Sequence, residues 1–233
     1  MEKAAPGRRR SPTGSAVARE ETALRQRLID TCLTMTALGI NQGTSGNVSA
    51  RWRDGLLITP SGLPYADMRP ADIVFLGLDG AVRGRGEPSS EWRFHRDILA
   101  ARPEVGAVVH THSVHATAVA ICRKALPAVH YMIGFVGGPT VRCAPYATFG
   151  SQELSNHAVK ALKGRNACLL ANHGVIAVGP TVDKALFLAQ EIEVLARQYI
   201  LALQVGTPQI LPAAEIATVV EKFKNYGPKP RKS

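Results

Sequence analysis

Three histidines stand where the chain could bind a metal ion. His110 and His112 are separated by one residue at the end of the apolar run 105–112, which is typical of a buried strand. Side chains at positions i and i+2 of a strand point to the same face, so both imidazoles project together. His173 lies between two apolar runs, next to Gly174, where the backbone can turn tightly. Three histidines with one open position are the usual protein ligands of catalytic zinc, although a His-x-His pair alone is structural as often as it is functional.

Glu91 is the second residue that could do chemistry. It follows Ser89 and Ser90 at the start of a helix expected over 89–101. A carboxylate in the first turn stabilises the helix dipole, and from the residues alone this structural role is favoured. The functional alternative is a carboxylate that faces a metal site and transfers protons.

Three pairs of small polar residues are candidates for an anion site. Each pair is expected in a turn or at a helix start, where backbone N–H groups are unpaired. Such groups bind phosphate oxygens where they converge, whereas any one pair alone is an ordinary turn. The pairs are Gly46-Asn47, Ser61-Gly62 and Ser89-Ser90.

The elements that must position these residues are helices and strands in irregular alternation. Helical periodicity predicts helices over 21–38, 89–101, 114–124, 151–163, 181–204 and 213–225. Apolar runs predict strands over 48–53, 56–59, 73–78, 105–112, 130–135 and 140–144, and a strand pair within 167–178. This order favours an α/β protein of the α+β type, a single domain with a mainly antiparallel central sheet flanked by helices.

The charge of the chain gathers at its ends. The net charge of the 233 residues is +10, of which residues 1–20 carry +3 and residues 222–233 carry +5. Basic ends on a nearly neutral body are typical of solvated tails, so we expect no nucleic-acid partner. We therefore divide the chain into a disordered basic extension (1–20), one folded domain (21–227) and a basic tail (228–233).

Composition excludes several other classes of protein. Hydrophobic residues make up 45% and charged residues 20%, which is typical of a folded domain and excludes global disorder. No run of about 18 apolar residues lacks charges, so we expect no membrane span. The four cysteines are too sparse for a disulfide scaffold and are expected to be buried free thiols, which favours the cytoplasm.

Five motifs together resemble the class II aldolase/adducin family. They are GNVSAR at 46–51, ITPSGLPY at 58–65, PSSEWRFH at 88–95, VHTH at 109–112 and NHG at 172–174. HYM at 130–132, CAPYATFG at 143–150 and EKFKNYG at 221–227 are further matches. The resemblance covers residues 21–227 and is specific because the motifs occur in the right order and at compatible spacing.

The resemblance implies the fold, the cofactor and the reaction. It implies a sheet of nine strands and a cyclic homotetramer whose active sites lie between neighbouring subunits. One Zn²⁺ per subunit would bind His110, His112 and His173, with Glu91 as acid/base and as a further ligand. The small-molecule substrate would be L-fuculose 1-phosphate or a close ketose 1-phosphate, cleaved to dihydroxyacetone phosphate and an aldehyde such as L-lactaldehyde.

The remaining roles implied by the resemblance concern the phosphate and two tyrosines. Tyr131 would reach into a neighbouring subunit and assist catalysis there, and Tyr226 would lie on a C-terminal arm that covers the site. The substrate phosphate would bind at Gly46, Asn47, Ser61, Gly62, Ser89 and Ser90.

Alternatives remain on the same scaffold. Sugar-phosphate 4-epimerases, a dehydratase and decarboxylases share the histidines, but glutamate at position 91, where the epimerases carry aspartate, favours the aldolases. Many relatives have His-His-Gly where this chain has Asn172-His173-Gly174, and the second histidine, which is kept, is the ligand position. A non-enzymatic adducin-like scaffold is disfavoured because all three histidines are present. A Schiff-base mechanism is disfavoured because the lysines lie in tails or polar helix stretches.

Overall fold

A sheet of nine strands runs through the part of the chain that the computed structural model describes, residues 14–224 and 226. The strand order is β4-β3-β2-β1-β5-β9-β8-β7-β6, and all pairs are antiparallel except β7 with β8. This confirms the mainly antiparallel sheet. The strands are β1 (Asn47–Trp52), β2 (Gly55–Ile58), β3 (Val74–Gly77), β4 (Val82–Arg83), β5 (Ala107–Thr111), β6 (Leu126–Pro127), β7 (Thr140–Ala144), β8 (Ala167–Leu170) and β9 (Gly174–Gly179).

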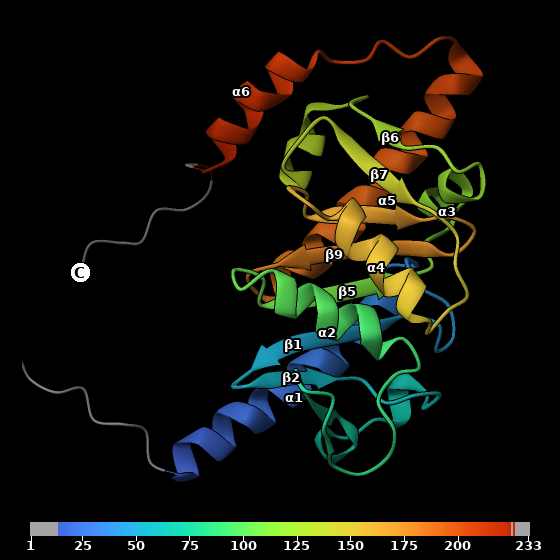
Figure 1. The fold of residues 1–233 in the computed structure, drawn as a ribbon. Coiled ribbons are helices and arrows are strands. Elements are labelled where there is room, and N and C mark those ends of the chain that lie inside the picture. Colours follow the sequence, from blue (N-terminus) through green and yellow to red (C-terminus); the bar gives the residue numbers. More distant parts are fainter. Residues whose placement is uncertain (1–13, 225, 227–233) are drawn as a thin grey trace, which may run out of the picture.

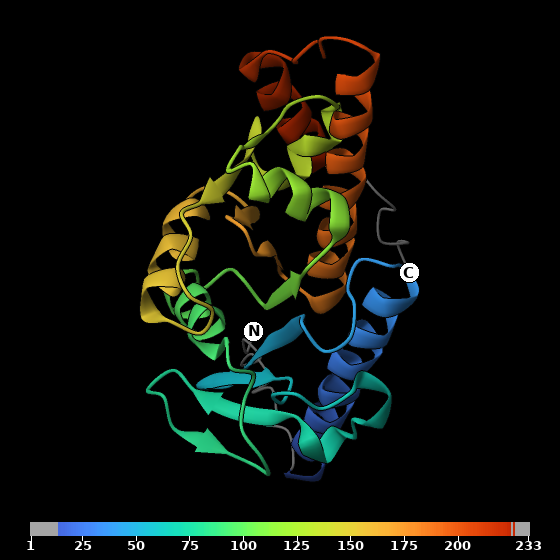
Figure 2. The same cartoon turned by 90° about the vertical axis from the view of Figure 1, so that its right-hand side faces the viewer.

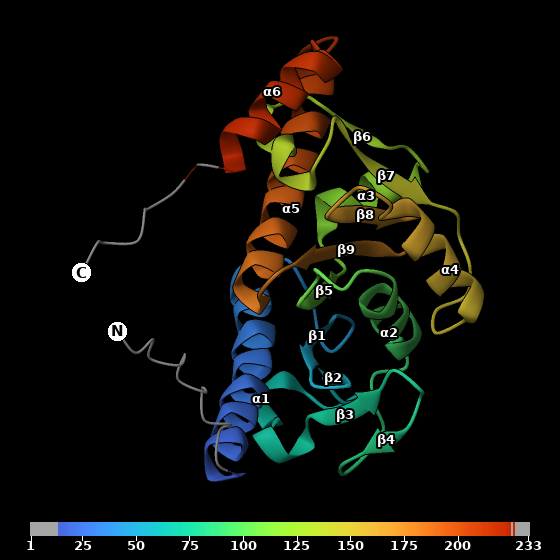
Figure 3. The ribbon, with the colours of Figure 1, turned by 60° about the vertical axis from the view of Figure 1, so that its left-hand side comes forward.

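Helices cover both faces of this sheet. In Figure 3, α1 and α5 lie on one face and α2 and α4 on the other, and Figure 2 shows the same layers from another side. Helix α6 packs beside the short helix η3 at one end of the molecule (Figure 1). The helices are α1 (Gly14–Ala37), α2 (Trp92–Ala101), α3 (Val114–Ile121), α4 (Gln152–Ala161), α5 (Val182–Val205) and α6 (Ala213–Lys224), with 3-10 turns η1 (Tyr65–Asp67), η2 (Pro70–Asp72) and η3 (Tyr131–Val136).

The sheet divides the hydrophobic core into two clusters, one on each of its faces. Val109 of β5 packs in the cluster that includes α1 and α5, whereas its neighbour Val108 packs in the cluster with α2 and α4. Every residue of β5 and β9 is buried, because both faces of these strands are covered. The alternation decides where His110 points: like Val108, it belongs to the face that α2 covers.

The expected disordered extension over 1–20 is wrong for its last seven residues. Helix α1 begins at Gly14, not at residue 21. Ala16 and Ala18 have high helix propensity, and Arg19 Nε donates a hydrogen bond to the carbonyl of Ser15 one turn earlier. Residues 1–13 and the expected tail at 228–233 lie outside the described residues.

The strand expected over 130–135 is also wrong, because Tyr131–Val136 form the 3-10 helix η3. His130 Nδ1 accepts a hydrogen bond from the backbone N–H of Met132 and so begins the helical turn. Gly137 ends it in a left-handed conformation, with φ of 86°. The apolar run therefore signals burial against α6 rather than sheet pairing.

Smaller differences follow from local structure. Strands β4 and β6 have two residues each, too short to show an alternating pattern in the sequence.

Cys122 is exposed at the end of α3, contrary to the expectation of four buried thiols, and all four cysteines are free. Among the described residues, no helix is long and apolar enough to cross a membrane.

Candidate metal centre

The three histidines predicted as ligands meet at one end of the central strands. His110 is the fourth residue of β5 and His112 follows the strand directly, while His173 precedes β9, the antiparallel neighbour of β5. Asn172 makes the turn into β9 possible with a left-handed backbone, φ of 54°. The ring centroids of the three histidines lie 4.9 Å from one another.

Glu91 is the fourth member of this group. It is the residue just before α2, rather than in its first turn, and it is 4% exposed. Its Oε2 lies 3.1 Å from His110 Nε2 and its Oε1 lies 3.2 Å from His173 Nε2. One ligand atom from each of Glu91, His110, His112 and His173 lies within 4.8 Å of the others.

The hydrogen bond behind His110 decides what this group can bind. Its Nδ1 lies 2.8 Å from the backbone carbonyl of Val175, which can only accept, so Nδ1 carries the proton. In the uncharged ring of His110 the lone pair is then on Nε2, which lies 3.0 Å from His112 Nε2. Two ring nitrogens and a carboxylate thus approach closely with electron pairs at their centre. A divalent cation satisfies this arrangement, and the donor set of three imidazoles and one carboxylate suits zinc.

The protonation states agree with cation binding. Burial alone would raise the pKa of Glu91, but His110, His173 and the Asn47 amide outweigh burial and lower it to about 2. Burial, together with the neighbouring rings, lowers the pKa of His112 to about 3 and that of His173 to about 4. At neutral pH the carboxylate is therefore ionised and these two imidazoles are uncharged, as metal ligands must be.

A cavity of about 420 Å³ opens beside this group, and the three small polar pairs converge on it. A bridge between Pro60 and Pro88 joins the two loops that carry the serine pairs. Ser61 N–H donates to the carbonyl of Glu87, and Ser89 N–H donates to that of Thr59. The lining includes Gly46, Asn47, Ser61, Gly62, Ser89, Ser90, Glu91, His112, Tyr146, Phe149, Asn172 and His173.

Comparison with known proteins decides the family. The family model "Class II Aldolase and Adducin N-terminal domain" matches residues 26–200. The chain belongs to the class II aldolase and adducin family. Similar proteins include the 5-methylthioribulose-1-phosphate/5-deoxyribulose-1-phosphate aldolase of Rhodospirillum rubrum, 57% identical over 205 residues that cover 88% of this chain and 93% of that one.

Two further relatives are L-fuculose phosphate aldolases. The Escherichia coli protein is 52% identical over 209 residues, 89% of this chain and 97% of that one. A solved structure of L-fuculose 1-phosphate aldolase shares 40% identity with a TM-score of 0.85, and the match covers 87% of this chain and 96% of that one. These relatives are class II aldolases, which are metal-dependent lyases, so the sequence-based expectation of a class II aldolase is confirmed.

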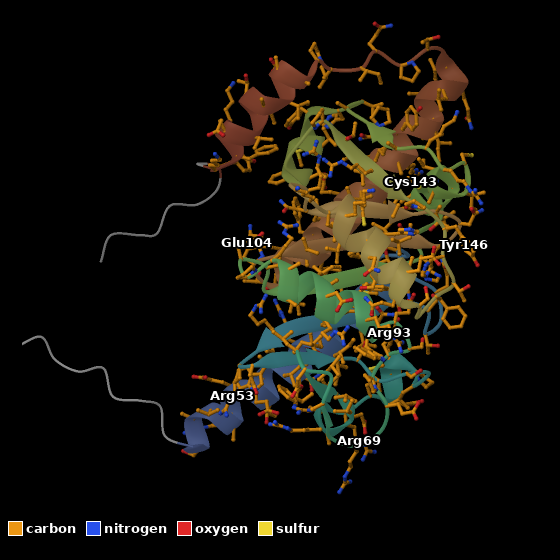
Figure 4. The ribbon with its side chains drawn as sticks, in the orientation of Figure 1. Arg53, Arg69, Arg93, Glu104, Cys143 and Tyr146 are labelled. Atoms are coloured by element: carbon orange, nitrogen blue, oxygen red, sulfur yellow. The ribbon has the colours of Figure 1, made fainter. Side chains whose placement is uncertain are left out.

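Tyr131 and Tyr226 lie apart from the cavity of this class II aldolase. Both pack around Phe223 of α6, with ring centroids 6.3 Å and 5.9 Å from it. Tyr131 is 49% exposed and Tyr226 is 78% exposed. Figure 4 shows Tyr146 of the cavity wall at the right-hand edge of the molecule, opposite Glu104, which precedes β5. Neither Tyr131 nor Tyr226 lines this cavity.

Buried polar residues that the sequence analysis did not single out hold the His110–His112 segment. Asn41 Oδ1 accepts from the backbone N–H of His112 at 3.1 Å, and Asn41 Nδ2 donates to Tyr65 Oη. On the other side, Glu193 of α5 accepts from the backbone N–H groups of His115 and Ala116 at the start of α3. Two features of the sequence could have pointed to these residues: the polar loop around Asn41, and the charge of Glu193 within an otherwise apolar helix.

His95 is buried although its sequence neighbours are polar. The polar neighbours of His95 and His157 on their helices favour surface or capping roles, but His95 is 0% exposed and His157 is half-buried. His95 Nε2 lies 2.5 Å from Asn47 Oδ1, and its Nδ1 lies 2.7 Å from Ser49 Oγ. Burial lowers the pKa of His95 to about 3. His95 lies on the same buried side of α2 as Phe94, Ile98 and Leu99, and this spacing could have predicted its burial.

Gly174 is a backbone position at which an added side chain would disturb the histidine cluster. A Cβ there would lie 2.4 Å from the carbonyl oxygen of Thr111 and within 3.2 Å of the rings of His110 and His112. We expect Gly174→Ala to lower the free energy of unfolding by about 1–3 kcal/mol and to weaken zinc binding. Thermal unfolding and zinc titration measure the two effects. Gly206→Ala, where a Cβ meets nothing within 4 Å, is the matched control and should change neither quantity.

The lowered histidine pKa values predict how the stability of the metal-free protein depends on pH. Unfolded histidines bind protons below about pH 6.5, where His95, His112 and His173 in the fold remain uncharged. Stability should therefore fall as the pH falls from 6.5 to 4.5, by about 1.4 kcal/mol per pH unit for each such histidine. The contribution of the ionised Glu91 to stability is lost only as the pH falls below about 4.5.

Urea unfolding at several pH values measures this dependence. The His95→Gln variant should show a slope shallower by the contribution of one histidine. An equal slope in the variant and the wild type would contradict the assignment of His95 as an uncharged buried group.

Proposed function

We propose that this class II aldolase uses zinc to cleave a ketose 1-phosphate to dihydroxyacetone phosphate and an aldehyde. The observation that carries the proposal is a cavity lined by His112, His173, Glu91 and the three small polar pairs, directly beside the ligand group that His110 completes. When bound, zinc supplies a Lewis acid that stabilises negative charge on the ketone oxygen of the substrate.

The phosphate is assigned to the loops opposite the histidines. Among the described residues, the backbone N–H groups of Gly62 and Ser90 donate to no protein atom. The N-terminus of α2 begins two residues after Ser90, and helix N-termini stabilise anions. These groups support our assignment of the phosphate site to Ser61, Gly62, Ser89 and Ser90, with Gly46 and Asn47 at the edge of the site.

Glu91 is assigned the proton transfer. Cleavage of the C3–C4 bond leaves negative charge on the dihydroxyacetone phosphate fragment, whose carbon must gain a proton. Glu91 lines the cavity between the histidines and the phosphate loops, where that carbon would lie. The C4 hydroxyl must also lose its proton, and we assign help in this step to Tyr131 of a neighbouring subunit. The exposure of Tyr131, away from its own cavity, supports the proposed homotetramer with sites between subunits.

The aldehyde portion is assigned to an apolar group. Tyr146 and Phe149 line the cavity and are 53% and 66% exposed, which suits a methyl or methylthio end rather than a hydroxylated one. The relatives named above act on L-fuculose phosphate or on 5-deoxy and 5-methylthio ribulose 1-phosphates. We therefore propose L-fuculose 1-phosphate and these two pentulose phosphates as the substrates to compare.

Metal removal tests the proposed reaction. Dihydroxyacetone phosphate release from the three substrates should stop after EDTA treatment and return with added Zn²⁺. The largest kcat/KM identifies the substrate. Undiminished release in EDTA, or no release from any of the three by zinc-loaded protein, would contradict the proposal.

Replacement of Glu91 tests the proton transfer. Glu91→Gln removes the ionisable group but keeps the three histidines, so we expect zinc to be retained and kcat to fall by about 10²–10⁴-fold. Metal analysis and steady-state kinetics measure both. The exposed Glu87, four residues earlier, provides the control variant Glu87→Gln, which should match the wild type. Unchanged turnover in Glu91→Gln would refute the assigned role.

A further inference from the structure

A buried line of hydrogen bonds runs from Glu91 away from the cavity. Asn47 Nδ2 donates to Glu91 Oε2 at 3.1 Å, Asn47 Oδ1 lies 2.5 Å from His95 Nε2, and His95 Nδ1 lies 2.7 Å from Ser49 Oγ. Glu91 and Asn47 are 4% exposed, and His95 and Ser49 are 0% exposed. His95 and Ser49 are therefore shielded from bulk water, whereas Glu91 and Asn47 border the cavity.

The fold explains why these four side chains meet. Asn47 and Ser49 are two residues apart on β1 and point to the same face of the sheet. Glu91 and His95 are four residues apart at the start of α2, so they lie on the same side of that helix. The line joins the first turn of α2 to the strand beneath it.

The direction of each hydrogen bond follows from the one before it. The ionised carboxylate of Glu91 only accepts, so the Asn47 amide must turn its NH₂ group toward Glu91. The carbonyl oxygen of Asn47 then faces His95, whose Nε2 must carry the proton. His95 Nδ1 is left with a lone pair and accepts from the Ser49 hydroxyl. Ser49 and His95 thus fix which way the amide of Asn47 faces.

The consequence is that the two oxygens of Glu91 differ. Oε2 accepts from Asn47 and lies 3.1 Å from His110 Nε2, whereas Oε1 is buried, has no hydrogen-bond partner among the described residues and lies 3.2 Å from His173 Nε2. The Nδ2 group of Asn47 has a second hydrogen, so the side chain can still donate to the phosphate.

We propose that His95 is a positioning residue for Glu91: through Asn47 it fixes the orientation of the carboxylate that exchanges a proton with the substrate carbon. This inference rests on the proposed function, since it assumes that Glu91 transfers that proton. Ser49 supports the same arrangement by holding the ring of His95.

A purely structural role for His95 makes a different prediction. Its ring stacks on Phe94 with centroids 4.7 Å apart, so His95 also fills the core. A core-filling role would let substitutions change stability without changing proton transfer in the folded protein. Glutamine can place an N–H group near the position of Nε2, whereas asparagine reaches only the position of Nδ1. His95→Gln and His95→Asn are therefore a matched pair that separates the two roles.

The experiment follows exchange of the hydroxymethyl hydrogen of dihydroxyacetone phosphate in D₂O by NMR, on full-length zinc-loaded protein without aldehyde. His95→Asn should slow exchange at saturating dihydroxyacetone phosphate by about 10–100-fold, with the half-saturation concentration unchanged within about twofold. His95→Gln should restore the rate to within about threefold of the wild type, and Ser49→Ala should slow it by about tenfold. Wild-type rates in folded His95→Asn and Ser49→Ala, or equal loss in both His95 variants, would overturn the inference.

A second measurement does not depend on turnover. ¹⁵N NMR of the metal-free wild type should show His95 as an uncharged ring with the proton on Nε2, and a proton on Nδ1 alone would overturn the inference. With the expected tautomer found, absence of exchange by zinc-loaded wild type would instead overturn the proposed function.

Discussion

The structure depends on three imidazoles and one carboxylate brought together at one point. His110 Nε2 faces both His112 Nε2 and Glu91 Oε2 at 3.0–3.1 Å, because the Nδ1–H group on the other side of the ring donates to the carbonyl of Val175. Such an arrangement is unfavourable by itself and becomes favourable when a cation occupies the centre. The fold therefore has to hold four donors in place against their mutual repulsion.

The sheet and its loops supply this restraint. His110 lies in β5, His112 and His173 directly adjoin β5 and its neighbour β9, and both strands are buried on both faces. Asn41 and Glu193 bind the backbone on either side of His112, and the line from Asn47 to Ser49 holds Glu91. Rigid support of this kind is what a metal site needs, since displaced ligands lose affinity and activity.

Much of this arrangement could be predicted from the sequence. The i, i+2 spacing of His110 and His112 predicted two imidazoles on one face, the resemblance to the family implied His173 as the third ligand, and the helix and strand patterns predicted the sheet. The polar neighbours of His95 favoured the surface, whereas its spacing of three and four residues from Ile98 and Leu99 placed it on the buried side of α2. The strand expected over 130–135 was wrong because apolar residues report burial but not whether a strand neighbour exists. The convergence of Ser61 and Ser89 depends on the Pro60–Pro88 bridge, a contact distant in sequence.

Zinc-edge anomalous diffraction from crystals of the zinc-loaded protein tests the central claim most directly. The arrangement predicts one peak per subunit, about 2.0–2.1 Å from the Nε2 atoms of His110, His112 and His173. A zinc peak elsewhere, with none among the three histidines, would contradict it.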